Sequence, residues 1–379
     1  MNNYLFTSES VGNGHPDKVC DQISDSILDA CLEQDPNSRV AVETLVTTQF
    51  VVIAGEVTTT ANIDYEQVAR NTIKEIGYTS KELGFDYQNA QILVKIHQQS
   101  PDISQGVTKT ETKEQGAGDQ GMMFGYATNE TPEFMPLTLK LSHDLVRKAK
   151  ELREQSVLTY LRPDCKSQIT LNYIDGKPDK IDAIVLSLNH DESVSLEQIR
   201  KDAIEHLIPI CKDYITNETK IYVNPTGRFV VGGPNGDTGV TGRKIIVDTY
   251  GGFARHGGGA FSGKDPSKVD RSGAYAARWV AKNIVAAGFC DRCEIQLSYC
   301  IGMAQPLNIY VDTFGTEKIP IEKIIESVKV FDLTPSGIIN SLKLKRPIYK
   351  RTASFGHFGN SEYPWEQLDM VEKLRNAID

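Results

Sequence analysis

The sequence lacks the features that mark membrane-spanning, exported and nucleic-acid-binding proteins. No uninterrupted apolar run approaches the ~18 residues that cross a bilayer, and the opening MNNYLFTSES has neither the basic nor the apolar region of a signal peptide. Basic residues are also in deficit, because 41 Lys and Arg face 50 Asp and Glu and give a formal net charge of -9. We therefore predict a soluble, cytoplasmic protein that binds neither membranes nor nucleic acids.

Cysteine is scarce as well. The chain has seven, an odd number that suits reduced thiols better than a disulfide framework. Cys290 and Cys293 have the spacing of a zinc or redox pair, but no second pair of ligands follows at similar spacing. We expect both side chains simply to be buried.

The chain does have enough apolar content for more than one core: 379 residues, 40% of them hydrophobic, predict two or three packed units. The apolar residues of 16–33 recur at three- and four-residue steps, which predicts a helix beginning at Pro16 with Asp17, Asp21 and Asp25 on one face. Other segments predict strands at 40–46, 49–56, 90–97, 168–174, 180–188, 220–224, 244–250 and 294–299, and helices at 64–77, 137–155, 272–287, from Ser195 and near Pro364.

Strands and helices mix irregularly and include a hairpin at Asp175-Gly176, so the predicted fold class is α+β rather than a regular alternation of βαβ units. We place the domains at 1–101, 113–231 and 232–379. Between the first two, residues 99–113 are polar and have no apolar period, which predicts a mobile loop or linker, with a lid as one possibility.

Two glycine-rich stretches invite nucleotide-binding motifs, and both fail a test of context. Gly116, Gly118 and Gly121 match G-x-G-x-x-G, but the polar residues before them cannot form a buried strand. Residues 258–264 match the start of a P-loop, but Asp265 stands where Ser or Thr would hold magnesium. We expect neither a dinucleotide-binding fold nor a Walker site.

A polyphosphate site is nevertheless indicated by basic side chains that lie among glycines. Glycine lets backbone N–H groups approach phosphate oxygens, while Lys and Arg supply positive charge. Asp265 and Asp270 beside them suit a hard metal ion. The alternative is an ordinary surface loop with solvated cations. The basic residues, all within 26 positions, are Arg243, Lys244, Arg255, His256, Lys264 and Lys268.

At the other end of the chain, His15 directly precedes the predicted helix of residues 16–33. Unpaired N–H groups at a helix N-terminus can bind an anion. The simpler alternative is that His15 has no catalytic role.

Several long motifs resemble the signatures of the S-adenosylmethionine synthetase family, also called methionine adenosyltransferases. They are TSESVGNGHPDK at 7–18, GAGDQGMMFGY at 116–126 and GGGAFSGKD at 257–265, with TLVTTQFVVIAGEVTT, LRPDCKSQ and NPTGRFVVGGP in the family's order. The resemblance covers Tyr4 to about Trp365. It implies three intertwined α+β domains with mixed sheets, magnesium and potassium as cofactors, and dimers with shared active sites, commonly paired into tetramers.

The resemblance also implies a reaction: the sulfur of L-methionine attacks C5′ of ATP, and the bound tripolyphosphate is then hydrolysed to pyrophosphate and phosphate. A thioether carries no proton, so this attack needs no general base. The difficulty is the triphosphate leaving group, which calls for cations placed where negative charge develops. The competing hypotheses are an ATP-dependent kinase or ligase and a polyphosphate-binding regulator without turnover.

Residue roles are implied by the matching motifs. The implied catalytic residues are His15, near the bridging oxygen, and Lys166, Arg243, Lys264 and Lys268, around the phosphates. Further ATP contacts are implied for Asp164, Arg228, Phe229, Asp237, Lys244 and Ala260. Methionine recognition is implied for Glu56, Gln99, Asp119, Asp237 and Lys268. The implied metal ligands are Asp17 and Asp270 for magnesium and Glu43 for potassium.

Three of these assignments have a simpler alternative, and two positions differ from the usual family pattern. Glu56 could be a solvated strand end, Glu43 a strand carboxylate paired with a cation, and Phe229 a core residue. Asn13 stands where the family commonly has an acidic residue, and Cys165 where a small residue is usual. From Cys165 we predict that a thiol reagent inhibits the protein and that ATP protects it.

Overall fold

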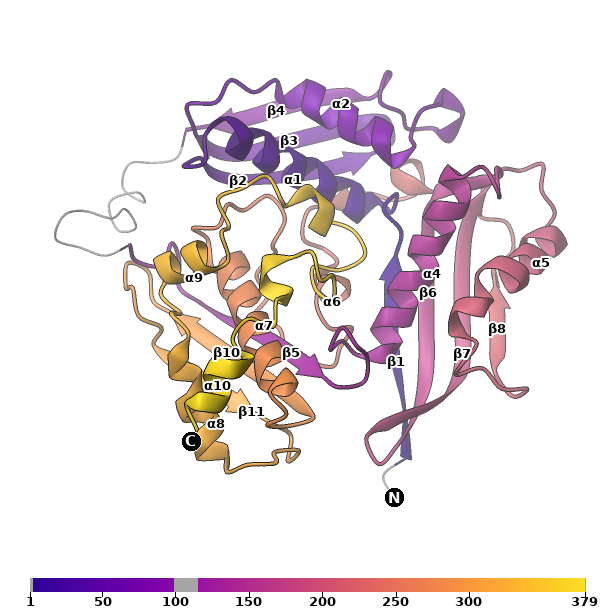
Figure 1. Ribbon diagram of the computed structural model, residues 1–379. Coiled ribbons are helices and arrows are strands. Elements are labelled where there is room, and N and C mark those ends of the chain that lie inside the picture. The colour runs from indigo at the N-terminus through magenta and orange to yellow at the C-terminus, as the bar shows by residue number, and fades with distance from the viewer. Residues whose placement is uncertain (1–2, 99–114, 379) are drawn as a thin grey trace.

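Three β-sheets, each covered by helices on one face, form the described part of the chain, residues 3–98 and 115–378 of a computed structural model (Figure 1). The sheet at the top of Figure 1 has the strand order β4-β3-β2-β9, with α1 and α2 packed against it. Its elements are α1 (Pro16–Gln34), β2 (Arg39–Thr47), β3 (Phe50–Thr58), α2 (Tyr65–Ile76), β4 (Gln91–His97) and β9 (Gly239–Val240).

Local sequence signals explain where these helices begin and end. Pro16 is the first helical residue of α1, as predicted. The Asp64 side chain caps α2 by accepting a hydrogen bond from the backbone N–H of Gln67 at 2.9 Å. Gly77 ends α2 with a φ of 112°, in the left-handed region that glycine adopts without strain.

The second sheet, at the right of Figure 1, has the order β1-β6-β7-β8 and is covered by α4 and α5. The predicted hairpin is present, with Asp175 and Gly176 both at positive φ between β6 and β7. Ser195 caps α5 by accepting from the N–H of Gln198 at 3.1 Å. The elements are β1 (Asn3–Val11), α4 (Leu137–Glu154), β6 (Leu161–Ile174), β7 (Lys177–His190), α5 (Leu196–His206) and β8 (Lys220–Val223).

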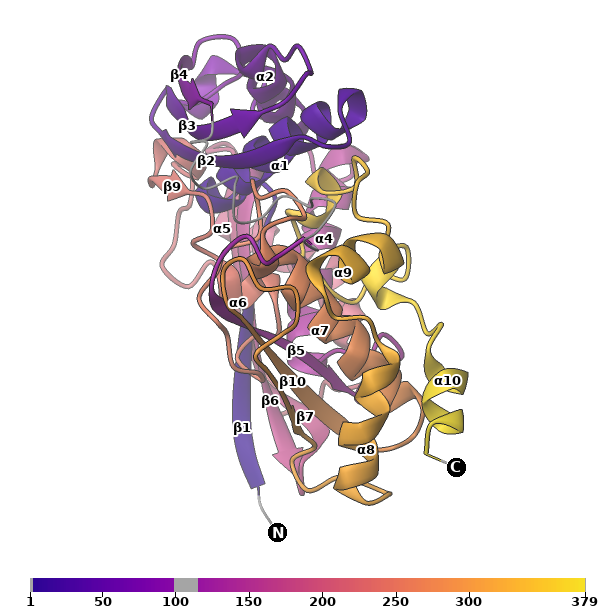
Figure 2. The same cartoon turned by 90° about the vertical axis from the view of Figure 1, so that its left-hand side faces the viewer.

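The third sheet has the order β11-β10-β5, and the buried helix α7 lies across it (Figure 2). Gly125 in β5 permits this close approach, because a Cβ at that position would lie 2.0 Å from the carbonyl carbon of Ala277 in α7. The elements are β5 (Gly121–Thr128), α6 (Ile245–Asp248), α7 (Val269–Ala286), β10 (Arg292–Tyr299), β11 (Asn308–Asp312), α8 (Ile321–Ser327), α9 (Pro335–Ser341) and α10 (Val371–Asn376).

Each sheet combines strands from distant parts of the sequence. β1 pairs with β6, β5 pairs with β10, and β9 pairs with β2, all antiparallel, while β3–β4 and β7–β8 are parallel. The prediction of intertwined α+β units with mixed sheets is confirmed. The domain boundaries near 101, 113 and 231 stay a prediction.

One local prediction is wrong, and two strands were missed. The predicted strand at 244–250 is wrong: residues 245–248 form the short helix α6, which buries Val247 and Asp248. β1 and β5 were not predicted as strands, because their pairing partners are more than 100 residues away and leave no local signal. None of the helices in the described ranges is long and apolar enough to cross a bilayer.

Candidate active site

His15 is the N-cap of α1 and is almost completely buried. Its Nδ1 accepts a hydrogen bond from the backbone N–H of Asp17 at 3.2 Å, so a neutral imidazole carries its proton on Nε2. Burial, followed by the positive charge of Lys244, lowers the pKa of His15 to about 3. His15 is therefore a neutral hydrogen-bond donor at physiological pH.

Asp17, two residues after His15, links α1 to β9 and to the residues that follow it. Its carboxylate accepts from the Lys244 ammonium at 2.6 Å and from the Val240 N–H at 3.0 Å, with the Arg243 guanidinium 3.6 Å away. Burial by itself raises the pKa of Asp17, but the bonds from Lys244 and Val240 outweigh it and hold that pKa below its ordinary value. A buried, ionised carboxylate therefore lies between two exposed or half-exposed cations.

Lys166 and Asp164 approach from β6. Lys166 is exposed and interacts electrostatically with both His15 and Asp164. Asp164 accepts from the Gly233 N–H at 2.9 Å, while its second oxygen has no protein partner. Burial raises the pKa of Asp164 to about 6, and the nearby Asp237 adds to this. We call His15, Asp17, Asp164, Lys166, Asp237, Arg243 and Lys244 the helix group.

The implied nucleotide contacts Phe229 and Arg228 lie beside this group on the segment after β8. Phe229 is half-buried, and its backbone is fixed by bonds with His190 and Asn189. Its partial exposure argues against the alternative of a core phenylalanine. Arg228 is exposed and pairs with Glu192 at 3.3 Å, an ion pair that a charged ligand can replace at little cost.

A second set of predicted residues lines a cavity of about 340 Å³ between β2, β3 and the glycine-rich loop. Glu43 and Glu56 project into it as exposed carboxylates, opposite Lys264, which pairs with Asp270 at 2.7 Å. No cation is paired with Glu43 among the described residues, so the alternative given for it does not hold. We call Glu43, Glu56, Ala260, Lys264 and Asp270 the cavity group.

Two further predicted residues, Lys268 and Asp119, belong to neither group. Lys268 is bound to Asp265 at 2.5 Å, and Asp265 is buried and also accepts from the Val40 N–H, so Asp265 serves the loop's structure. Asp119 is exposed before β5 and accepts from the neighbouring Gln120 N–H. Gln99 and the predicted lid lie outside the described residues.

The helix group and the cavity group come together where the backbone of Gly242 lies against Ala260. Gly242 packs against Ala260 so closely that a Cβ on Gly242 would lie 2.4 Å from the Ala260 Cβ. Within residues 3–98 and 115–378, no hydrogen bond or ion pair joins a side chain of the helix group to one of the cavity group. One chain therefore presents two clusters of predicted site residues with separate charge networks.

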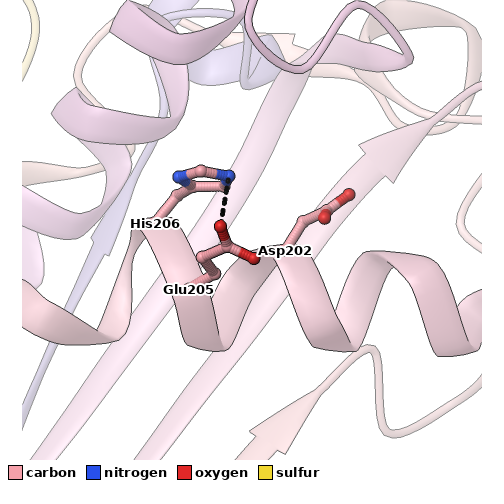
Figure 3. A group of neighbouring side chains, drawn as sticks. All are labelled: Asp202, Glu205 and His206. Carbon is pink, nitrogen blue, oxygen red and sulfur yellow. Dashed lines mark ion pairs between the residues drawn. The ribbon is translucent and has the colours of Figure 1, made fainter.

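The predicted metal ligands do not form a ready-made metal cluster. Among the described residues, one group of three brings its ligand atoms within 4.8 Å of each other, and it is Asp202, Glu205 and His206 on α5 (Figure 3). These residues belong to neither group, and Asp202 already accepts from Tyr160 and Gln198. Asp17 and Asp270 instead suit a hard ion that takes one or two carboxylates and completes its shell with water and phosphate.

Comparison with known proteins identifies the family. Sequence models of the N-terminal, central and C-terminal domains of S-adenosylmethionine synthetase match residues 3–101, 114–229 and 231–367. The chain is also 57% identical over 388 aligned residues to "S-adenosylmethionine synthase" of Clostridium tetani (strain Massachusetts / E88), an alignment that covers 99% of each protein. The chain belongs to the S-adenosylmethionine synthetase family. It is thus an enzyme, a transferase of S-adenosylmethionine biosynthesis, and the kinase, ligase and regulator hypotheses are not supported.

Two expectations about cysteine have different outcomes in this family member. Cys290 and Cys293 are buried and free, as predicted. The prediction that Cys165 is reactive is contradicted by its environment, because only 5% of the residue is exposed. Burial, with the negative charge of Asp164 nearby, raises the pKa of Cys165 to about 12, so almost none of it is thiolate at neutral pH.

Motif comparison with the family also missed buried charges beneath the site. Lys18 is fully buried and bonds Asp21 at 2.9 Å as well as Asp248, while Arg271 makes a two-pronged pair with Asp25 at 2.6 and 2.9 Å. The three Asp residues on one face of the predicted helix were a signal for such partners, because buried carboxylates need cations or hydrogen-bond donors.

Proposed function

We propose that this enzyme transfers the adenosyl group of ATP to the sulfur of L-methionine and then hydrolyses the bound tripolyphosphate to pyrophosphate and phosphate. The observation that carries the proposal is the helix group. It gathers a neutral His15, an ionised Asp17 and three cations, Lys166, Arg243 and Lys244, at the N-terminus of a buried helix.

The arrangement suits departure of a triphosphate. As the C5′–O bond breaks, negative charge develops on the leaving oxygen and spreads over the phosphates. The Nε2–H of neutral His15 is available to donate a hydrogen bond to that oxygen, and Lys166 is exposed and close enough to His15 to stabilise the same charge. Since Asp17 already positions Lys244, the cation does not have to reorganise during the reaction.

The methionine sulfur, which is the nucleophile, needs no catalytic base. Sulfur attacks with a lone pair and loses no proton, so the product is a sulfonium cation. The carboxylates of Glu56 and Asp237, both exposed, would stabilise that positive charge and bind the methionine amino group. Asp119, Gln99 and Lys268 complete the proposed methionine contacts, and Asp164, Arg228, Phe229 and Ala260 the nucleotide contacts.

The metal ligands fit the donor chemistry of hard cations. Asp17 and Asp270 are carboxylates beside phosphate-binding lysines, as a magnesium ion shared with a polyphosphate requires, and exposed Glu43 is an oxygen donor of the kind that potassium takes. When bound, magnesium would neutralise phosphate charge.

The test is incubation with ATP, methionine, Mg²⁺ and K⁺, with detection of S-adenosylmethionine by mass spectrometry and of both phosphate products. Release of ADP or AMP in its place would contradict the proposal. Lys166→Met is expected to lower kcat by about 10²–10³-fold, as loss of one oxyanion-stabilising donor does. The matched control is Lys180→Met, which removes an exposed lysine paired with Glu218 in the β6–β7 hairpin and should leave kcat unchanged.

We also propose that the working enzyme is a homo-oligomer, a dimer with shared active sites and commonly a dimer of dimers. The separation of the helix group from the cavity group supports this, as does the first sheet, where Leu93 of β4 is 41% exposed. The test mixes His15→Ala and Lys264→Ala subunits. If a site takes His15 from one subunit and Lys264 from its partner, mixed dimers have one intact site of two, and random mixing restores about a quarter of the activity. No restoration would contradict shared sites.

A cytoplasmic location is proposed on the state of the thiols. All seven cysteines are free, which suits a reducing compartment.

A further inference from the structure

One face of α1 holds four aspartates at four-residue intervals, and each accepts hydrogen bonds from backbone of the C-terminal half. Asp17 accepts from the Val240 N–H at 3.0 Å, and Asp21 from the Gly242 N–H at 2.8 Å. Asp25 accepts from the Gly263 N–H at 2.8 Å. Asp29, at the end of the row, accepts from the N–H groups of residues 349 and 350 at 2.9–3.1 Å.

The two middle contacts lie next to the proposed phosphate-binding side chains. Gly242 directly precedes Arg243 and Lys244, and Gly263 directly precedes Lys264. Both glycines have left-handed backbone, with φ of 78° and 81°, and neither has room for a side chain. A Cβ on Gly263 would lie 1.9 Å from the Val42 carbonyl oxygen.

The charges beneath these contacts are neutralised separately from the site. Lys18 is shared between Asp21 and Asp248, and Arg271 pairs with Asp25 while also donating to the Phe261 carbonyl oxygen at 3.0 Å. Asp21, Asp25, Lys18 and Arg271 are all fully buried and cannot touch a substrate. Whatever they do for catalysis, they must do through the loops that they hold.

We infer that Asp21 and Asp25 are positioning residues: each fixes one glycine of a phosphate-binding loop by its backbone N–H, and so places Lys244 with Arg243, or Lys264, around the polyphosphate. The inference rests on the proposed function. A shift of about 1 Å in such a binding group can cost about 100-fold in rate, so the acceptor matters beyond its contribution to stability.

The deciding experiment compares Asp21→Ala with Asp21→Asn. Both remove the charge and leave Lys18 paired with Asp248, but only Asn keeps an oxygen that can accept from Gly242. We expect Ala to raise the KM for ATP by about tenfold or more while the KM for methionine changes little, and Asn to restore most of the loss. Partial unfolding would lower kcat without moving one KM alone. Equal KM values for ATP in Asp21→Ala and wild type would overturn the inference.

Asp29→Ala is the matched control, because it removes the same kind of acceptor from the same helix face, but from a segment that carries no site residue. It should lower the melting temperature and leave the KM for ATP unchanged. An equal rise in that KM would show that any break along α1 has the same effect, and would overturn the specific role of Asp21.

A second pair of variants tests the inference if Asp21→Ala does not fold. Gly242→Ala and Gly176→Ala introduce the same backbone strain, at φ of 78° and 79°, but Gly176 lies in an open hairpin turn. Only Gly242→Ala should raise the KM for ATP, and a wild-type value would overturn the inference. If the wild type forms no S-adenosylmethionine, the proposed function fails, and calorimetric binding of tripolyphosphate to the same variants still tests the positioning role.

Discussion

Replacement of Arg278 by methionine should loosen the C-terminal segment from the rest of the enzyme. The Arg278 guanidinium is fully buried on α7 and makes a two-pronged pair with Glu366, with both distances 2.9 Å. It also donates to three backbone carbonyl oxygens, those of Tyr126, Glu133 and Phe134, at 2.7–2.8 Å. One side chain thereby joins the end of β5, the loop that follows it and the segment after residue 350.

The size of the stability loss depends on the buried groups that lose Arg278 as a partner. Burial alone would raise the pKa of Glu366, but Arg278 and then Lys282 hold it below its ordinary value, so the carboxylate is charged at neutral pH. Removing one partner of a buried ion pair costs about 3–5 kcal/mol. Lys282 still pairs with Glu366 at 2.7 Å, but three buried carbonyl oxygens also lose their donor, so we keep this range. Methionine fills similar volume, so the loss is electrostatic rather than a cavity. An unfolding entropy of about 2.1 cal/mol/K per residue over 379 residues gives about 1.3 °C per kcal/mol, so the melting temperature should fall by about 4–6 °C.

The assay is thermal unfolding together with hydrogen exchange of peptides that cover 130–136 and 361–368. Exchange should accelerate in both peptides, because they lose a common tether. The matched control is Arg351→Met in the same segment, where the pair with Glu362 is largely exposed and contributes under about 1 kcal/mol. A melting temperature for Arg278→Met within about 1 °C of the Arg351→Met value, less than about 1 kcal/mol between them, would refute the reasoning.

Two other outcomes are expected. A thiol-specific reagent at pH 7.5 should modify Cys300, the one partly exposed cysteine, and leave Cys165 unlabelled in the native enzyme; early labelling of Cys165 by peptide mapping would contradict its burial. Acid should weaken the fold through buried His143: burial holds its pKa well below 6.5, so below pH 6.5 only the unfolded chain takes up that proton, and stability falls by about 1.4 kcal/mol between pH 7.5 and 5.5. His143→Gln should remove its share of this slope while His15 and His357, whose pKa values burial also lowers, keep theirs, and an unchanged slope in urea unfolding would count against the assignment.

Much of the local structure could be predicted because the interactions that form it are local. Periodic apolar residues, Pro16 at a helix start and Asp64 and Gly77 at helix ends are signals within a few residues of the element that they shape. The same holds for the hairpin at Asp175-Gly176. The family signatures are contiguous stretches, so family membership could be recognised without any knowledge of the fold.

The strand at 244–250 was mispredicted because the interaction that decides its structure is not local. Its β-branched residues favour a strand, but Asp248 lies buried against Lys18, 230 positions away, and α6 satisfies that contact. β1 and β9 likewise became strands of sheets whose other members are distant in sequence.

Most of the longer helices, the hairpin, the family and the placing of Asp17, Asp21 and Asp25 on one helix face could be read from the sequence alone. That this face packs against the C-terminal half, which backbone N–H groups it binds, and that the predicted site residues fall into two separate clusters became visible only once the chain was folded. The physical reason is the number of residues that separate the interacting groups. Helix periodicity and turn chemistry act over a few residues, whereas the hydrogen bonds of Asp21 and Asp25 span more than 200 positions and exist only after the chain has packed.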